Sequence, residues 1–237
     1  MVVEHMTMDE FREQLVRRPL AVLPVGSIEQ HGPHLPLGLD AMHAFAVAEA
    51  TANVEPCIVL APLYYGLCRS SSQHPGTIGI SGETLRHIIY DIGLSLSSQG
   101  VKALCILSGH ASGVHMGALR EAGEKLLAAT AMEVAVACVL ELLPPGMLED
   151  PRDSHAGELE TSVAMHLWPE LVRRPLPEPA YPSIHPFILT RRKIEAWPSG
   201  IWGSPTLASA EKGRQIFEAE VEAFARLIRE LTRSIEA

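Results

Sequence analysis

Residues 20–40 read LAVLPVGSIEQHGPHLPLGLD, and the first six of them form an apolar run that predicts a buried β-strand. The polar remainder contains Glu29, His31, His34 and Asp40, whose oxygen and nitrogen atoms are donors that bind divalent metals. In α/β enzymes, chemistry usually takes place where a central strand leaves its sheet. This stretch therefore predicts a strand of the core and a metal site at the end of that strand.

Apolar runs of the same kind recur along the chain as CIVLA, ALCIL and VAVACVL. They are nearly continuous rather than alternating, which is typical of a parallel sheet covered on both faces. Helical segments separate them, so we expect right-handed βαβ units and a three-layer α/β/α sandwich with a mostly parallel central sheet. We expect strands at residues 20–25, 57–61, 103–107 and 133–140, and helices at about 7–18, 41–53, 83–98, 114–130, 157–167 and 209–235.

The composition is that of an ordinary globular protein. The 237 residues are 47% hydrophobic and 20% charged, without repeats or linkers, so we expect a single domain over residues 1–237. A formal net charge of -9 disfavours nucleic-acid binding, which needs a basic face. We see neither a membrane span nor a secretory stretch and expect a cytoplasmic protein that binds no membrane. The four cysteines lack C-x-x-C spacing, which favours buried thiols.

Three polar motifs follow directly after the first three predicted strands: GSIEQHG, the loop ending in SSSQHPGT, and SGHASGVH. In a parallel sheet, these loops converge on the edge formed by the carboxyl ends of the strands. A fourth motif, SHAGELETS at residues 154–162, lies beyond the fourth strand and can reach the same edge. The order of the motifs therefore predicts one polar site assembled from distant segments.

The histidines of these motifs do not all have the same expected role. His110 stands between small residues after a buried strand, where a lone histidine is most often a core residue. Its convergence with Glu29 and His31 favours a metal ligand instead. His34 has two open interpretations, because it can bind metal or only orient its loop. His115 is expected in the following helix, with a structural role.

The segment GSIEQHGPHLPLGLDA resembles the signature of the creatininase family of metal-dependent amidohydrolases. The resemblance extends over most of the chain through HPGTIGIS (74–81), SGHASG (108–113), HAGELETS (155–162) and GSPTLASAEKG (203–213). It implies a three-layer α/β sandwich that holds two divalent metals per chain, often zinc, manganese or iron. It also implies a homo-oligomer, either a hexamer or a dimer.

By this resemblance, Glu29 binds one metal and His31 the other, Asp40 bridges both, and His110 completes the first site. Creatininase has a glutamate two positions after the histidine that matches His110, and this chain has Ser112 there. The family pattern N-G-H-G-G-N is also altered, because serine and glycine replace its two asparagines. One ligand is therefore missing from its usual position.

We expect Glu160, in the motif HAGELETS, to replace the missing ligand at the site that contains His31. Glu158 and Glu160 cannot share one helical face, so at most one of them points strongly at the site. His155 matches the catalytic histidine of the family. We expect it to be the proton donor to the leaving nitrogen rather than a primary ligand.

The resemblance implies an amidohydrolase that cleaves a carbon–nitrogen amide bond of a cyclic or otherwise small substrate through a hydroxide bridging two metals, with zinc expected. Creatinine is not the expected substrate. Creatininase has tryptophans beside its catalytic histidine, whereas PPGMLEDPRDSHAGE has none, and Trp168, Trp197 and Trp202 lie elsewhere. The alternatives are a deformylase or peptide-trimming peptidase of the same family, and a metal-binding homologue without catalysis.

Overall fold

The computed structural model describes residues 2–185 and 188–236, and within them four parallel strands form one sheet in the order β2-β1-β3-β4. The strands are β1 (Leu20–Val25), β2 (Ile58–Val59), β3 (Ala103–Ser108) and β4 (Glu133–Cys138). The central strands β1 and β3 pair along their whole length, and every residue of both is buried. Continuous apolar runs suit these positions because both faces of the strands are covered.

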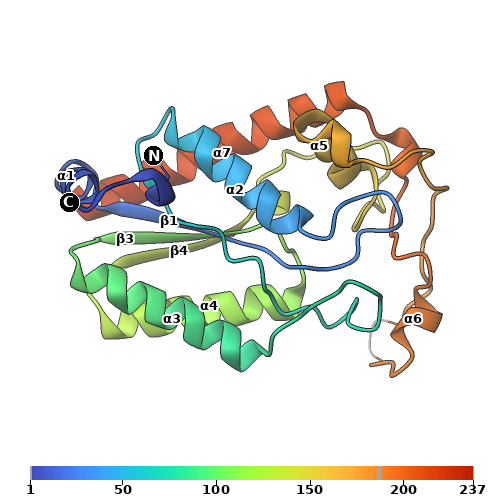
Figure 1. The fold of residues 1–237 in the computed structure, drawn as a ribbon, viewed down its shortest axis with the longest axis horizontal. Coiled ribbons are helices and arrows are strands. Elements are labelled where there is room, and N and C mark those ends of the chain that lie inside the picture. The colour runs from blue at the N-terminus through green and yellow to red at the C-terminus, as the bar shows by residue number, and fades with distance from the viewer. Residues whose placement is uncertain (1, 186–187, 237) are drawn as a thin grey trace.

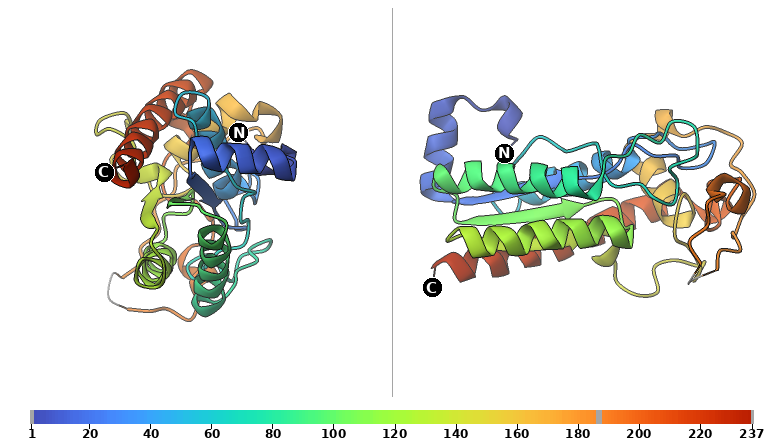
Figure 2. Two further views of the ribbon diagram at one scale, coloured as in Figure 1. Left: turned by 90° about the vertical axis from the view of Figure 1, so that its left-hand side faces the viewer. Right: turned by 90° about the horizontal axis from the view of Figure 1, so that it is seen from below.

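Helices cover both faces of the sheet (Figures 1 and 2). Helices α3 (Gly82–Ser98) and α4 (Gly113–Ala129) lie on one face, and α2 (Leu39–Ala52) and α7 (Ala210–Glu236) lie on the other. Two apolar clusters fill the spaces between these layers. On the α7 side, for example, Phe224 and Ile228 of the helix belong to the same buried cluster as strand residues. The predicted three-layer sandwich with a parallel sheet is confirmed.

Shorter elements surround the sandwich. Helix α1 (Met8–Arg17) begins at a capping box formed by Thr7 and Glu10. Helix α5 (Glu158–Leu167) packs on α7, and the short α6 (Lys193–Ala196) lies in the proline-rich segment that follows α5. Single 3-10 turns occupy Val3–His5, Val139–Glu141, Pro169–Leu171 and Pro205–Leu207.

Both edge strands are shorter than predicted. Strand β2 covers Ile58–Val59 rather than 57–61, and Pro62, which has no N–H to donate, follows soon after it. Strand β4 ends at Cys138 rather than at residue 140, because its partner β3 ends at Ser108, directly opposite. The chain then turns into the 3-10 segment that leads toward the site.

The other global expectations concern membranes and cysteines. Among the helices of residues 2–185 and 188–236, none combines the length and apolarity that a bilayer crossing requires. The four cysteines are buried, as predicted.

Candidate active site

The site lies at the carboxyl edge of the sheet, where the first turn of α2 packs directly against the ends of β1 and β3. Two glycines make this approach possible. A Cβ on Gly26 would lie 2.1 Å from the backbone nitrogen of Ala41, and one on Gly109 would lie 2.0 Å from the carbonyl oxygen of Asp40. The absence of side chains at both positions therefore places Asp40 between the loops that follow the two central strands.

Asp40 is 3% exposed, and its two carboxylate oxygens face different histidines. Oδ1 lies 3.0 Å from Nε2 of His31, and Oδ2 lies 3.1 Å from Nδ1 of His110. The hydroxyl of Ser27 donates a hydrogen bond of 2.7 Å to Oδ2. This is the arrangement expected of a carboxylate shared by two cation sites.

Two groups of potential ligands meet at Asp40. In the first, Oε1 of Glu29 lies 3.0 Å from Nδ1 of His110, and Ser71 donates a short hydrogen bond to the other oxygen of Glu29. In the second, Oε1 of Glu160 lies 3.8 Å from Nε2 of His31. The ligand atoms of His31, Asp40 and Glu160 all lie within 4.8 Å of one another, and the three residues are buried.

The charges of these groups are strongly coupled. Burial alone would raise the pKa of Glu29, but the neighbouring His110 lowers it to about 2. Burial would lower the pKa of His31, but the carboxylates of Asp40 and Glu160 raise it to about 10. Without metal, protons on the histidines therefore balance the buried carboxylates. Divalent cations could take over this role, so the donor set fits a metal centre.

Helix α5 separates its two glutamates. Glu160 enters the cluster, and its Oε2 accepts a short hydrogen bond from the N–H of Ala156. Glu158 points elsewhere: it accepts hydrogen bonds from the backbone of residues 149 and 150 and pairs with Lys212. The structure thus places Glu160 where the sequence analysis expects a ligand and gives Glu158 a structural role.

His155 lies at the rim of the cluster. Its ring stacks on His31 with a centroid distance of 4.4 Å, and its Nε2 lies 2.8 Å from the carbonyl oxygen of Gln30. The other ring nitrogen, Nδ1, faces the carboxylates and lies 4.0 Å from Glu29 Oε1. If Nε2–H donates to the carbonyl of Gln30, Nδ1 carries the lone pair of the neutral ring. The His155 side chain is 14% exposed, so solvent can reach it.

Two tryptophans that are distant from His155 in the sequence lie beside it in the structure. The backbones of His155 and Trp202 are paired through hydrogen bonds of 3.0 and 2.8 Å. The ring of Trp197 lies edge-on to His155 at 5.1 Å. Both tryptophans line a cavity of about 300 Å³ that also borders Glu29, Asp40, His110 and Glu160. A long proline-rich segment folds back to bring them there, which no short motif reveals.

Two further histidines have supporting roles. Nε2 of His34 lies 2.8 Å from the hydroxyl of Thr161, which favours loop orientation over metal binding. Nδ1 of His115 accepts a hydrogen bond of 3.1 Å from the N–H of Leu67, so its expected structural role fits.

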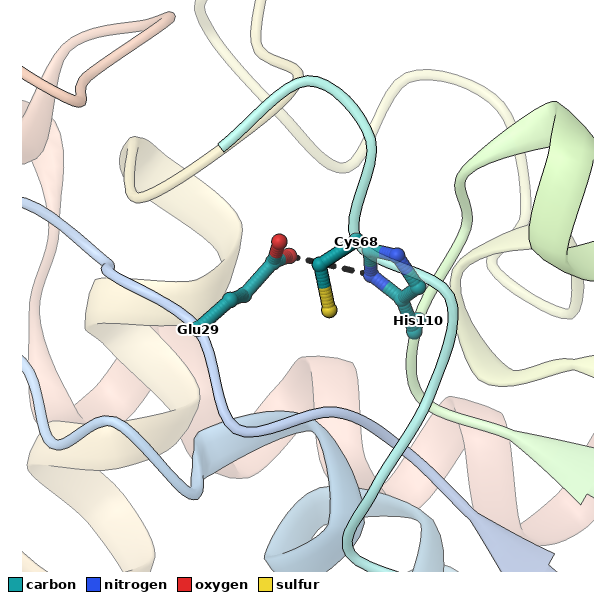
Figure 3. A group of neighbouring side chains, drawn as sticks. All are labelled: Glu29, Cys68 and His110. Atoms are coloured by element: carbon teal, nitrogen blue, oxygen red, sulfur yellow. Dashed lines mark ion pairs between the residues drawn. The ribbon is translucent and has the colours of Figure 1, made fainter. Parts of the chain in front are cut away.

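Cys68, which no sequence motif indicated, joins Glu29 and His110 in a possible ligand group (Figure 3), and Glu29, His31 and His155 form another. Burial raises the pKa of the Cys68 thiol to about 11, so a metal-free centre keeps it protonated. The hydroxyls of Ser27 and Ser71, which support the carboxylates, were missed too. Cys68 and Ser71 lie in the loop that follows the second strand. The position of that loop at the carboxyl edge of the sheet could have indicated both residues.

The sheet and the clustered donors together define an α/β protein with a candidate metal centre at the carboxyl edge of its sheet. The family model of creatininase, described as creatinine amidohydrolase, matches residues 4–228, and the chain belongs to this family.

Proteins similar to this chain include a mycofactocin precursor peptide peptidase of Mycobacterium ulcerans, 35% identical over 86% of this chain and 82% of the relative. The creatinine amidohydrolase of Pseudomonas putida is 29% identical over 88% of each chain. A solved manganese creatininase superposes with a TM-score of 0.87 at 25% identity, covering 98% of both chains. These matches support an amidohydrolase of the creatininase family.

Proposed function

We propose that this protein hydrolyses a carbon–nitrogen amide bond of a cyclic or otherwise small substrate, with the help of two divalent cations. One cation would be held by Glu29, Asp40 and His110, and the other by His31, Asp40 and Glu160. The observation that carries the proposal is the position of Asp40, whose two oxygens lie 3.0 and 3.1 Å from histidines of different loops.

When bound, the cations would polarise the substrate carbonyl and activate water for attack. The chain itself supplies the proton chemistry. Nδ1 of His155 would deliver a proton to the leaving nitrogen, while the carbonyl of Gln30 holds the opposite ring nitrogen. The edge-on ring of Trp197 restricts the movement of the imidazole and shields one side of the cavity.

Zinc is the cation that we propose, with manganese and iron as alternatives. Nitrogen, oxygen and sulfur donors within one buried cluster suit zinc. Solved creatininases similar to this chain include a zinc–zinc form and a manganese form.

A peptide substrate is the second candidate. Four curated relatives between 31% and 35% identical to this chain are called mycofactocin precursor peptide peptidases, whereas the creatinine amidohydrolase is 29% identical. The chemistry at the metal centre would be the same, because a peptide bond is also an amide. The shape of the cavity beyond His155 and the tryptophans would then decide which amide is accepted.

The test combines metal analysis with turnover. Protein loaded with zinc or manganese should contain about two ions per chain and hydrolyse at least one member of a panel of cyclic amides, formylated amines and short peptides. Asp40→Ala should lose both ions, because it removes the shared ligand, whereas Glu29→Ala should weaken one site more than the other. Unchanged metal content in Asp40→Ala would contradict the dinuclear centre. Full metal content without turnover across the panel would favour a non-catalytic metal-binding protein.

We further propose that the chain acts in the cytoplasm as a single domain and assembles into a homo-oligomer, either a hexamer or a dimer. The creatininase resemblance supports this assembly. Light scattering after size-exclusion chromatography measures its mass directly, and a monomer at micromolar concentration would contradict it.

A further inference from the structure

Cys68 lies at the candidate metal centre without being part of any motif that suggested it. Its Sγ, a carboxylate oxygen of Glu29 and a ring nitrogen of His110 all lie within 4.8 Å of one another. The three residues are buried and come from three separate loops at the carboxyl edge of the sheet (Figure 3). Sγ lies 3.8 Å from the carbonyl oxygen of Gly66, a weak contact that a cation could replace.

The loop that carries Cys68 is held on both sides. The N–H of Leu67 donates to Nδ1 of the buried His115, and the carbonyl of Gly66 accepts a hydrogen bond of 2.8 Å from Ile80. The ring of His115 in turn lies edge-on to His110 at 4.8 Å. The thiol is therefore positioned by the same contacts that position the histidine ligand.

A thiol at this place makes the two cation sites unequal. Without it, each site has three protein donors and shares Asp40. With it, the site of Glu29 and His110 would have four protein donors of mixed type once Asp40 is counted, which is the number that tetrahedral zinc prefers. The site of His31 and Glu160 keeps three protein donors, with Asp40 as the third. Thiolate is a soft ligand that favours zinc, whereas manganese favours carboxylates and water.

We propose that Cys68 is a direct ligand of the cation held by Glu29, Asp40 and His110, and that it makes this one site selective for zinc over manganese. The inference rests on the proposed metal centre. On binding, the S–H bond breaks, the proton leaves to solvent and a sulfur–metal bond forms, with no change of oxidation state. The site of His31 would remain the exchangeable one.

The test uses cobalt(II) as a spectroscopic probe in the full-length protein. Metal-free protein is titrated with cobalt while bound metal and the near-ultraviolet sulfur-to-cobalt charge-transfer band are measured together. The wild type should bind two cobalt ions and show the band, whereas Cys68→Ser should bind cobalt without it. Cys138→Ala is the matched control and should keep the band, because Cys138 is a buried cysteine of β4 that belongs to none of the ligand groups found among the described residues.

Competition between zinc and manganese gives a second measurement. In Cys68→Ser, the preference of one site for zinc should fall by at least about tenfold, while the other site is unchanged. Two cobalt ions bound to the wild type without the band would overturn the inference, and this result does not depend on any variant folding. A band that persists in Cys68→Ser would overturn it as well.

These outcomes separate the inference from the proposed function. Absence of any bound cobalt would remove the metal centre and both proposals with it. Two bound ions with the band but no amide turnover would remove the proposed activity and leave the role of Cys68 intact. Two bound ions with amide turnover but without the band would remove the role of Cys68 and leave the proposed activity intact.

Discussion

At the scale of single residues, His155 differs from the other histidines of the centre in how it is held. His31 and His110 are buried and each lies about 3 Å from carboxylate oxygens, at 3.0 and 3.1 Å from Asp40. His155 is partly exposed, and its Nδ1 is 4.0 Å from the nearest carboxylate oxygen. A nitrogen in this position can exchange protons with solvent, which a proton donor must do in every turnover.

We therefore expect His155→Ala to keep nearly full metal content and to lose activity by roughly 10²–10⁴-fold, the usual size of a general acid–base contribution. The loss should fall on kcat more than on KM. Elemental analysis and steady-state kinetics on the identified substrate measure both effects, and added imidazole should restore part of the rate. Loss of metal in this variant would instead make His155 a ligand.

At the scale of elements, helix α5 presents two glutamates to different surroundings. Glu160 meets the cluster around His31, whereas Glu158 binds the backbone of the preceding loop and Lys212 of α7. Two positions along the helix, just over half a turn, therefore separate a candidate ligand from a structural anchor within the same motif.

Glu160→Gln should lower the occupancy of the site of His31, because an amide is a much poorer metal donor than a carboxylate. Glu158→Gln is the matched control and should leave metal content near two ions per chain while reducing stability, because it weakens the pairing with Lys212. Metal titration and urea unfolding of both variants separate the effects. Equal metal loss in the two variants would refute the assignment of Glu160.

A buried pair joins the helices on one face of the sheet. Nε2 of His43 in α2 lies 2.7 Å from Oε2 of Glu220 in α7, with side chains 3% and 0% exposed. Burial would lower the pKa of His43, but Glu220 raises it. Because α2 also carries Asp40 in its first turn, this contact connects the packing of α7 to the position of the candidate bridging ligand.

Glu220→Ala should reduce the free energy of unfolding by about 3–5 kcal/mol, because it leaves a buried imidazolium without its partner. The double variant His43→Leu, Glu220→Leu should recover much of this loss, since no buried charge remains. Urea unfolding of the single and double variants measures the difference. A double variant no more stable than Glu220→Ala would show that packing, rather than charge, determines the effect.

At the scale of the whole molecule, the candidate metal centre concentrates buried charge at one edge of the sheet, so we expect stability to depend on metal and pH. In metal-free protein the pKa of His31 is raised from 6.5 to about 10. The contribution of protonated His31 to the free energy of unfolding is therefore complete below pH 6.5 and is lost as pH rises through 10. The pKa of Glu29 is lowered from 4.5 to about 2, so its contribution is present above pH 4.5 and is lost as pH falls through 2.

We expect the melting temperature of the metal-free protein to fall as pH rises from neutral toward 10. The melting temperature of the metal-loaded protein should fall less over this range. Its histidine ligands are already neutral, so raising the pH removes no proton from them. Both forms should still lose some stability at alkaline pH, partly because His43, whose pKa is also raised, loses its proton. Calorimetry of both forms across this pH range measures the difference, and identical pH profiles would contradict the coupling of His31 to metal.

The sequence by itself determined the sandwich and most of the candidate ligands of this protein. Continuous apolar runs are typical of parallel strands that are covered on both faces, and this pattern predicted β1 and β3 closely. Parallel strands bring their following loops to one edge, so Glu29, Asp40 and His110 could be expected together before their distances were known. The ends of β2 and β4 were less predictable, because an edge strand stops where its partner stops.

Only the tertiary structure decided which side chains complete the centre. It turned Glu160 toward the cluster and Glu158 toward the backbone of residues 149 and 150, folded Trp197 and Trp202 against His155, and placed the thiol of Cys68 beside Glu29. Short motifs record residue type and local spacing, and these are the properties that make a metal ligand recognisable. Contacts between segments far apart in the chain depend on how whole layers pack, and no local pattern contains that information.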